Sequence, residues 1–74
     1  MSDAELILAA IETAGLSARR FAEWALGRDE RTIRRWSAGQ VPIPPQARAW
    51  LEWWLSLSDR DRTRMVKLIR SGRT

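Results

Sequence analysis

The sequence predicts an all-α fold, a compact bundle of about five helices within a single domain at residues 1–74. Two observations predict it. Apolar residues recur at the three- and four-residue spacing of helices, and no segment shows the alternating pattern of a strand. Residues that cap helices, and glycines that end them, then divide the chain into segments of helical length. A domain of 74 residues has a small core, so a partner subunit would add to its stability.

The first helix is expected at about residues 3 to 14. Ser2, followed by Glu5, forms the pattern of a capping box, in which two side chains satisfy backbone amides of the first turn. Gly15 then offers a left-handed stop. Between these signals, one face of the helix is apolar: Leu6, Ile7, Ala10, Ile11 and Ala14.

The second and third helices are separated by about three residues around Gly27. Ser17 can cap the second helix, which stops near that glycine. Asp29 is a good N-cap for the third helix, expected at about residues 29 to 38 before Gly39. The residues expected to face the core are Phe21, Ala22, Ala25 and Leu26 in the second helix, and Ile33 and Trp36 in the third.

Three prolines keep residues 40 to 45 extended, and the fourth helix is expected to begin near Pro45. Its apolar stripe is Ala47, Trp50, Leu51, Trp54 and Leu55. Ser58 and Asp61 form a second capping-box pattern, which opens a fifth helix that Gly72 closes.

The C-terminal segment, residues 58–74, has three interpretations: a solvated helix, an additional clamp on phosphates, or a dimer element. The dimer element is favoured, because the apolar surface of the last two helices exceeds what one core contact requires. The residues predicted to form the dimer interface are Trp53, Leu57, Met65, Leu68 and Ile69.

Composition excludes several classes of function. The chain has no cysteine and no histidine, so it predicts no disulfide, no metal site, no cofactor and no imidazole base. Its carboxylates fall at helix caps and on outward faces without a paired acidic site, which argues against an enzyme. The longest apolar run is far short of the roughly 20 residues that cross a bilayer, and the acidic start does not resemble a signal peptide. We therefore expect a cytoplasmic protein that does not bind membranes.

Charge is distributed unevenly along the chain. The formal net charge is +4, but residues 1 to 16 sum to −3, residues 17 to 36 to +3 and residues 58 to 74 to +4. The third helix and its preceding turn hold four arginines between two glycines. If Ile33 and Trp36 face the core, the residues on or beside the exposed face are Glu30, Arg31, Thr32, Arg34 and Arg35.

The spacing of these residues resembles that of the Cro and lambda-repressor-like helix-turn-helix proteins of phages and bacteria. The resemblance covers roughly residues 6 to 57 and rests on the pattern Phe21-Ala22-(x)4-Gly27-(x)4-Thr32-Ile33-Arg34-Arg35-Trp36-(x)2-Gly39-(x)2-Pro42. It implies a double-stranded DNA-binding transcriptional regulator, usually a repressor, whose third helix enters the major groove. It also implies that Glu30, Arg31 and Arg35 reach base edges and that the start of the second helix, residues 17 to 20, lies against phosphates.

Chemistry assigns the arginines different roles. Arg31 and Arg35 lie four residues apart on one face and suit bidentate contacts to guanine, whereas Arg34 sits to one side and suits a phosphate. Glu30 either stabilises the first helical turn or accepts a hydrogen bond from a cytosine amino group. Thr32 is a capping hydroxyl, a phosphate donor or a contact to a thymine methyl group. The predicted phosphate contacts are Ser17, Arg19, Arg20, Arg28, Thr32 and Arg34.

One spacing departs from the family pattern. The interval from Ala22 to Gly27 is one residue longer than is common, which predicts a changed angle between the second and third helices. Ser37 also stands where the family often has glutamate.

The favoured hypothesis is a homodimeric repressor that binds an inverted-repeat DNA operator. The alternatives are a protein-interaction module, such as an antitoxin or a phage accessory protein, and a non-specific DNA-binding protein. Single-strand binding by aromatic stacking is disfavoured, because such platforms usually display aromatic residues on a sheet.

Overall fold

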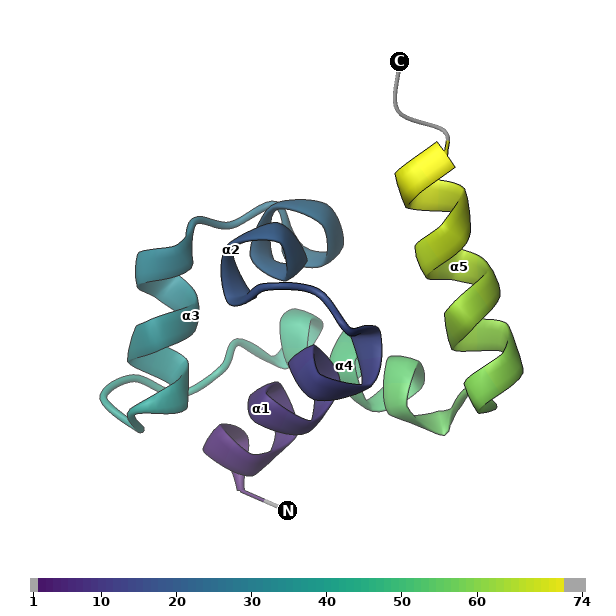
Figure 1. The fold of residues 1–74 in the computed structure, drawn as a ribbon. Coiled ribbons are helices and arrows are strands. Elements are labelled where there is room, and N and C mark those ends of the chain that lie inside the picture. The colour runs from purple at the N-terminus through teal and green to yellow at the C-terminus, as the bar shows by residue number, and fades with distance from the viewer. Residues whose placement is uncertain (1, 72–74) are drawn as a thin grey trace.

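The regular structure of the chain is helical. The computed structural model describes residues 2–71, with side chains described as far as Leu68. This part contains no strand, and its elements are α1 (Asp3–Ala14), α2 (Ala18–Phe21), the π-helix η1 (Ala22–Leu26), α3 (Glu30–Ser37), α4 (Pro45–Ser56) and α5 (Asp59–Ser71) (Figure 1). The predicted all-α class with five helices is therefore confirmed.

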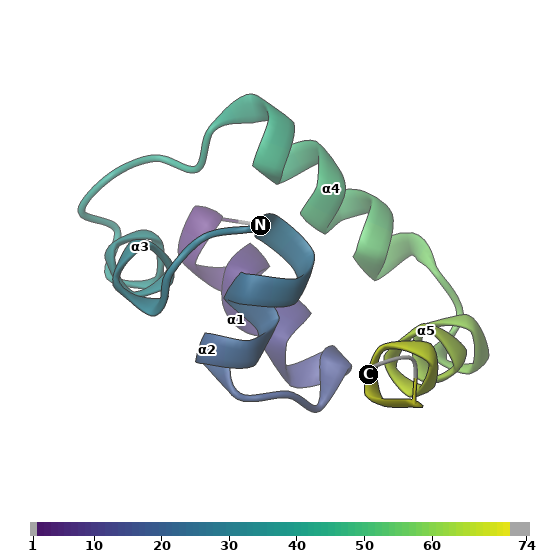
Figure 2. The same cartoon turned by 90° about the horizontal axis from the view of Figure 1, so that it is seen from above.

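Helix α1 organises the bundle, because α3, α4 and α5 all pack against it. In two perpendicular views, α3 and α5 lie at opposite ends of the molecule (Figures 1 and 2). The chain thus forms a small bundle of 34 × 25 × 19 Å with one helix exposed at each end.

The predicted apolar stripes meet in one core. Ile33 and Trp36 of α3 are only 1% and 3% exposed, as the i, i+3 spacing predicted. The core closes around the side chains of Leu6, Ile7, Ala10, Ala14, Phe21, Ala22, Ile43, Leu51, Trp54 and Val66.

The predicted helix starts are also confirmed. Ser2 and Glu5 form a complete capping box, and the hydroxyl oxygen of Ser17 accepts the backbone N–H of Arg20 at 3.1 Å. At the start of α5, the hydroxyl oxygen of Ser58 accepts the backbone N–H of Asp61 at 3.1 Å. Each cap is a local contact across three residues, which explains why it was visible in the sequence.

The long interval before Gly27 takes the form of a π-helical turn. The N–H groups of Gly27 and Arg28 both point to the carbonyl oxygen of Ala22, and the second hydrogen bond measures 3.1 Å. A π-turn holds one residue more than an α-turn. Gly27 then ends the segment at φ +61°, a left-handed conformation that favours glycine.

Aromatic rings fill the space between η1 and α4. Trp24 lies edge-on to Trp54 at 5.4 Å between ring centroids, and Trp50 stacks on Trp54 at 5.6 Å with an interplanar angle of 8°. Phe21 and Trp53 extend this cluster through edge-on contacts with Trp50. Trp24 is thus partly buried against the core.

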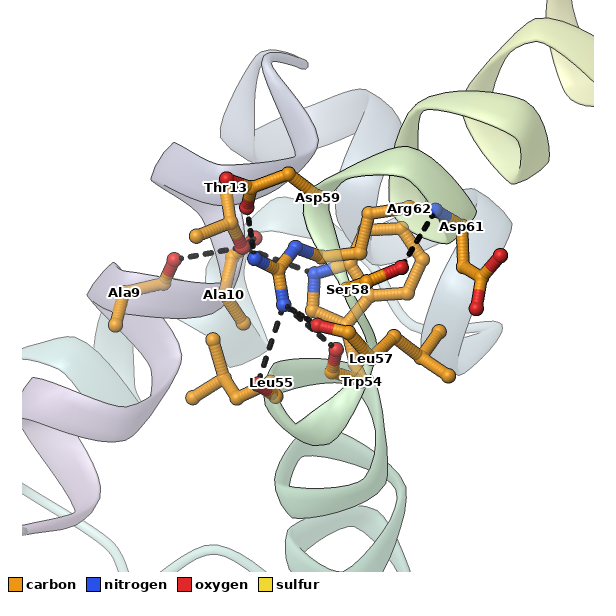
Figure 3. Close-up of polar contacts among 10 residues, drawn as sticks. All are labelled: Ala9, Ala10, Thr13, Trp54, Leu55, Leu57, Ser58, Asp59, Asp61 and Arg62. Carbon is orange, nitrogen blue, oxygen red and sulfur yellow. Dashed lines mark hydrogen bonds and ion pairs between the residues drawn. The ribbon is translucent and has the colours of Figure 1, made fainter.

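The junction between α4 and α5 is held by a single arginine. The side chain of Arg62 is 12% exposed, and its guanidinium donates hydrogen bonds to the carbonyl oxygens of Trp54, Leu55 and Leu57, at 3.3, 3.1 and 2.5 Å (Figure 3). It also pairs with Asp59. These carbonyls lie at the end of α4, where the regular helical N–H partners run out, although that of Trp54 also accepts the backbone N–H of Leu57 at 3.2 Å. The cation supplies further donors there and complements the helix dipole.

Candidate nucleic-acid interface

The candidate site is centred on the outward face of α3. Its capping residue, Asp29, has extended backbone angles, and its carboxylate accepts the backbone N–H of Thr32 at 3.0 Å. The hydroxyl of Thr32 donates to the same carboxylate oxygen at 2.8 Å. These two hydrogen bonds favour the charged carboxylate and lower the pKa of Asp29 below its ordinary value, with a smaller contribution from the positive charge of Arg31.

The burial of one edge of α3 determines where its arginines point. Successive residues turn by about 100° around a helix, so Arg31 lies opposite the edge formed by Ile33 and Trp36. Arg34 and Arg35 lie on either side of Arg31, and all three are exposed. α3 therefore presents a ridge of three guanidinium groups to solvent.

The arginines of this ridge differ from others in the fold because they form no ion pair among the described residues. Arg19 pairs with Glu23 at 3.6 Å, and Arg48 pairs with Asp3 and with Glu52. By contrast, among the residues that the structure describes, no carboxylate lies within 4.0 Å of the guanidinium groups of Arg20, Arg28, Arg31, Arg34 or Arg35. Their charge is available to an external anion.

The predicted phosphate contacts on α2 lie beside α3, because these two helices pack against each other. Ser17, Arg19 and Arg20 are exposed at the start of α2, as is Arg28 in the turn that leads to α3. Ser17 uses an oxygen lone pair for its cap, which leaves the hydroxyl proton available to a phosphate oxygen.

Two of the predicted contact residues are less accessible than the arginines. Glu30 and Thr32 are half-buried. Because the hydroxyl proton of Thr32 is donated to Asp29, Thr32 could donate to a phosphate only by giving up that bond. Its capping interpretation is the one that the geometry favours.

The end of α3 is anchored by contacts that the sequence analysis missed. The N–H groups of Gly39 and Gln40 donate to the carbonyl oxygens of Trp36 and Arg35, at 3.1 and 3.0 Å, which closes α3 in a Schellman motif. Farther along, the carboxylate of Asp3 accepts the backbone N–H of Ile43 at 2.9 Å. This contact joins residues 40 positions apart, so no local pattern could have indicated it.

The predicted dimer residues have different environments. Trp53 and Leu68 are 45% and 64% exposed, whereas Leu57 and Met65 are partly buried against the core. The side chain of Ile69 lies outside the described residues. Trp53 and Leu68 are thus the accessible apolar members of the predicted interface.

No group of three or more histidine, cysteine or carboxylate side chains in the described part of the chain is placed to hold a metal ion. Within the same residues, no helix is both long and apolar enough to cross a membrane. Comparisons with protein-family models, with curated proteins and with solved structures found no match.

Proposed function

We propose that this protein is a sequence-specific double-stranded DNA-binding regulator that represses transcription. α2, η1 and α3 would act as a helix-turn-helix, with α3 in the major groove and the start of α2 against the phosphate backbone. The observation that carries the proposal is the exposed ridge of Arg31, Arg34 and Arg35, which has no carboxylate partner in the described part of the chain, on a helix whose opposite edge is anchored in the core.

Affinity and specificity would come from different side chains. Arg31 and Arg35 are the proposed readers of guanine, because a guanidinium can donate two hydrogen bonds to its O6 and N7 atoms. Arg19, Arg20, Arg28 and Arg34 would neutralise phosphates and set the register of the domain on the duplex. The Asp29 cap supports this arrangement by fixing the start of α3.

The regulator would act as a homodimer on an inverted-repeat operator, with its two recognition helices about one turn of DNA apart. Trp53 and Leu68 are the apolar side chains available for a subunit contact. Sedimentation of the protein at operator-saturating concentrations tests the dimer, which a purely monomeric distribution would reject.

Selection of bound sequences from a random pool of duplex DNA tests the function directly. The expected result is an enriched motif of two inverted half-sites. On the selected site, log K should fall with log salt by about 0.9 for each phosphate contacted. Binding without any enriched motif would indicate a non-specific DNA-binding protein, and no binding across the salt series would favour a protein-interaction module.

A further inference from the structure

The outer face of α1 combines one exposed leucine with two carboxylates. Leu8 is 54% exposed although it belongs to the helix at the centre of the bundle. Glu5 and Glu12 lie three residues before it and four after it, so both are its neighbours on the helix surface. With Ala9, these residues line a shallow hollow on α1. We call this set the α1 face.

The outer face of α5 has the opposite charge. A shallow hollow is lined by Arg60, Thr63, Arg64 and Lys67, with Asp59 at its margin. The four residues stand at positions i, i+3, i+4 and i+7, the four-residue hole that receives a side chain in knobs-into-holes packing of helices. We call these four residues the α5 face.

The two arginines of the α5 face are available for pairing. Arg60 and Arg64 are exposed, and no ion pair joins either of them to a carboxylate within the described residues. Asp59 does not neutralise them, since its carboxylate is held by Arg62. Glu12 on the α1 face likewise has no ion-pair partner in the part of the chain that the structure describes.

We propose that the α1 face binds the α5 face of a second copy of this chain, with Leu8 inserted between Arg60, Thr63, Arg64 and Lys67. Glu12 and Glu5 would pair with the arginines around the hole. The contact is separate from the apolar surface of Trp53 and Leu68, and it does not rest on DNA binding. Because α5 lies at the opposite end of the molecule from α3, the contact on α5 leaves α3 accessible (Figures 1 and 2).

The size of the two faces determines the strength to expect. One pair of short helical surfaces buries less than the roughly 1,000 Å² of a stable protein interface, so the association should be weak. Because the association depends on exposed charges, it should also weaken as the salt concentration rises above about 0.1 M, where the Debye length is about 10 Å. Copies held close together on one DNA molecule would associate more readily than free ones.

Sedimentation in low salt and without DNA tests the proposal with two variants. The α1-face variant is Leu8→Ala with Glu12→Lys, and the α5-face variant is Arg60→Glu with Arg64→Glu. All four positions are exposed, and Glu5 is left unchanged because it caps α1. We expect the wild type to associate, each variant alone to associate at least about tenfold more weakly, and their equimolar mixture to recover a one-to-one complex. Recovery follows because each variant retains the face that the other has lost.

Several outcomes would overturn the proposal: a wild type that stays monomeric at every concentration, variants that associate like the wild type, or a mixture that stays monomeric. Circular dichroism of each variant checks its helical content, and Arg60→Gln with Arg64→Gln is the milder pair if the charge reversal unfolds α5. Gln46→Ala on α4, an exposed position outside both faces and outside the apolar surface, is the control, and we expect its association to stay within about twofold of the wild type. Leu68→Gln separates the proposed contact from the apolar interface. If Leu68→Gln abolishes association while the face variants retain it, the contact belongs to the apolar interface.

Discussion

The indole N–H of Trp54 donates a hydrogen bond of 3.0 Å to the hydroxyl oxygen of Thr13, which lies 41 residues earlier in the chain (Figure 3). The hydroxyl of Thr13 in turn points to the carbonyl oxygens of Ala9 and Ala10, each at 3.0 Å. Trp54 is fully buried, so its N–H depends on this partner. The contact joins α4 to α1 beside the junction with α5, where Arg62 holds the end of α4.

Replacing Thr13 with valine removes the acceptor but preserves the shape of the side chain. We expect the free energy of unfolding to fall by about 1–2 kcal/mol, because the buried N–H of Trp54 is left unpaired. Urea unfolding followed by tryptophan fluorescence measures the change. Thr13→Ser retains the hydroxyl and should recover most of the loss. A loss in Thr13→Ser without a loss in Thr13→Val would show that the methyl group, and not the hydrogen bond, stabilises this contact.

Arg62→Met removes the donors to three carbonyl oxygens while keeping the apolar part of the side chain. We expect a loss of about 1.5–3 kcal/mol in the free energy of unfolding, since the end of α4 loses charged hydrogen bonds at a site shielded from water. Arg60→Met is the matched control on the exposed side of α5 and should change stability by less than about 0.5 kcal/mol. Similar effects of the two substitutions would contradict the capping role of Arg62.

The Asp29 cap of α3 should make the free energy of unfolding depend on pH. Its pKa is lower in the folded chain than in the unfolded chain, because Thr32 donates hydrogen bonds to the carboxylate. The stabilisation is therefore complete above the unfolded pKa and is lost as the pH falls through the lowered folded value. Urea unfolding between pH 6 and pH 2 measures this slope. Asp29→Asn retains a capping side chain that does not titrate, so its free energy of unfolding should depend less on pH than that of the wild type. Some pH dependence should remain, because the pKa of Glu5 is also lowered by its cap with Ser2. An unchanged slope would exclude the Asp29 contribution.

Gly27 occupies a left-handed conformation at φ +61°, with no neighbouring atom within 4 Å of the position that a Cβ would take. Gly27→Ala should therefore cost about 1–2 kcal/mol through the backbone alone. Asparagine adopts this conformation more readily, so Gly27→Asn should lose less stability. Thermal unfolding of the two variants compares them. Equal stability of Gly27→Ala and the wild type would show that the turn relaxes away from this conformation.

Two arginine variants separate base reading from phosphate contact in the proposed function. Arg35→Ala should lower the preference for the selected site over random duplex DNA by about 1–3 kcal/mol, whereas Arg19→Ala should weaken binding to both by a similar factor. Competition binding at one fixed salt concentration measures both preferences. A parallel loss of specificity in the two variants would show that this assignment of base and phosphate contacts is wrong.

The sequence predicted those parts of the fold that depend on neighbours within a few residues. Ser2, Ser17, Asp29 and Ser58 cap the helices that they were predicted to cap, because a cap joins a side chain to an amide three residues later. Periodicity identified the buried edge of α3, and from it the arginines that point outward. The sequence did not show that the segment before Gly27 would form a π-turn.

Only the tertiary structure decided which side chains meet across the bundle. The bond from Trp54 to Thr13 and the anchoring of Ile43 by Asp3 join positions far apart in sequence, and the packing of α1 against α4 brings them together. The sequence likewise could not distinguish the environments of the arginines. Arg62 is enclosed by carbonyl groups, whereas Arg31 is exposed to solvent. Local patterns determine where a helix begins and which edge it buries, and the placement of the helices determines which charges remain for a partner.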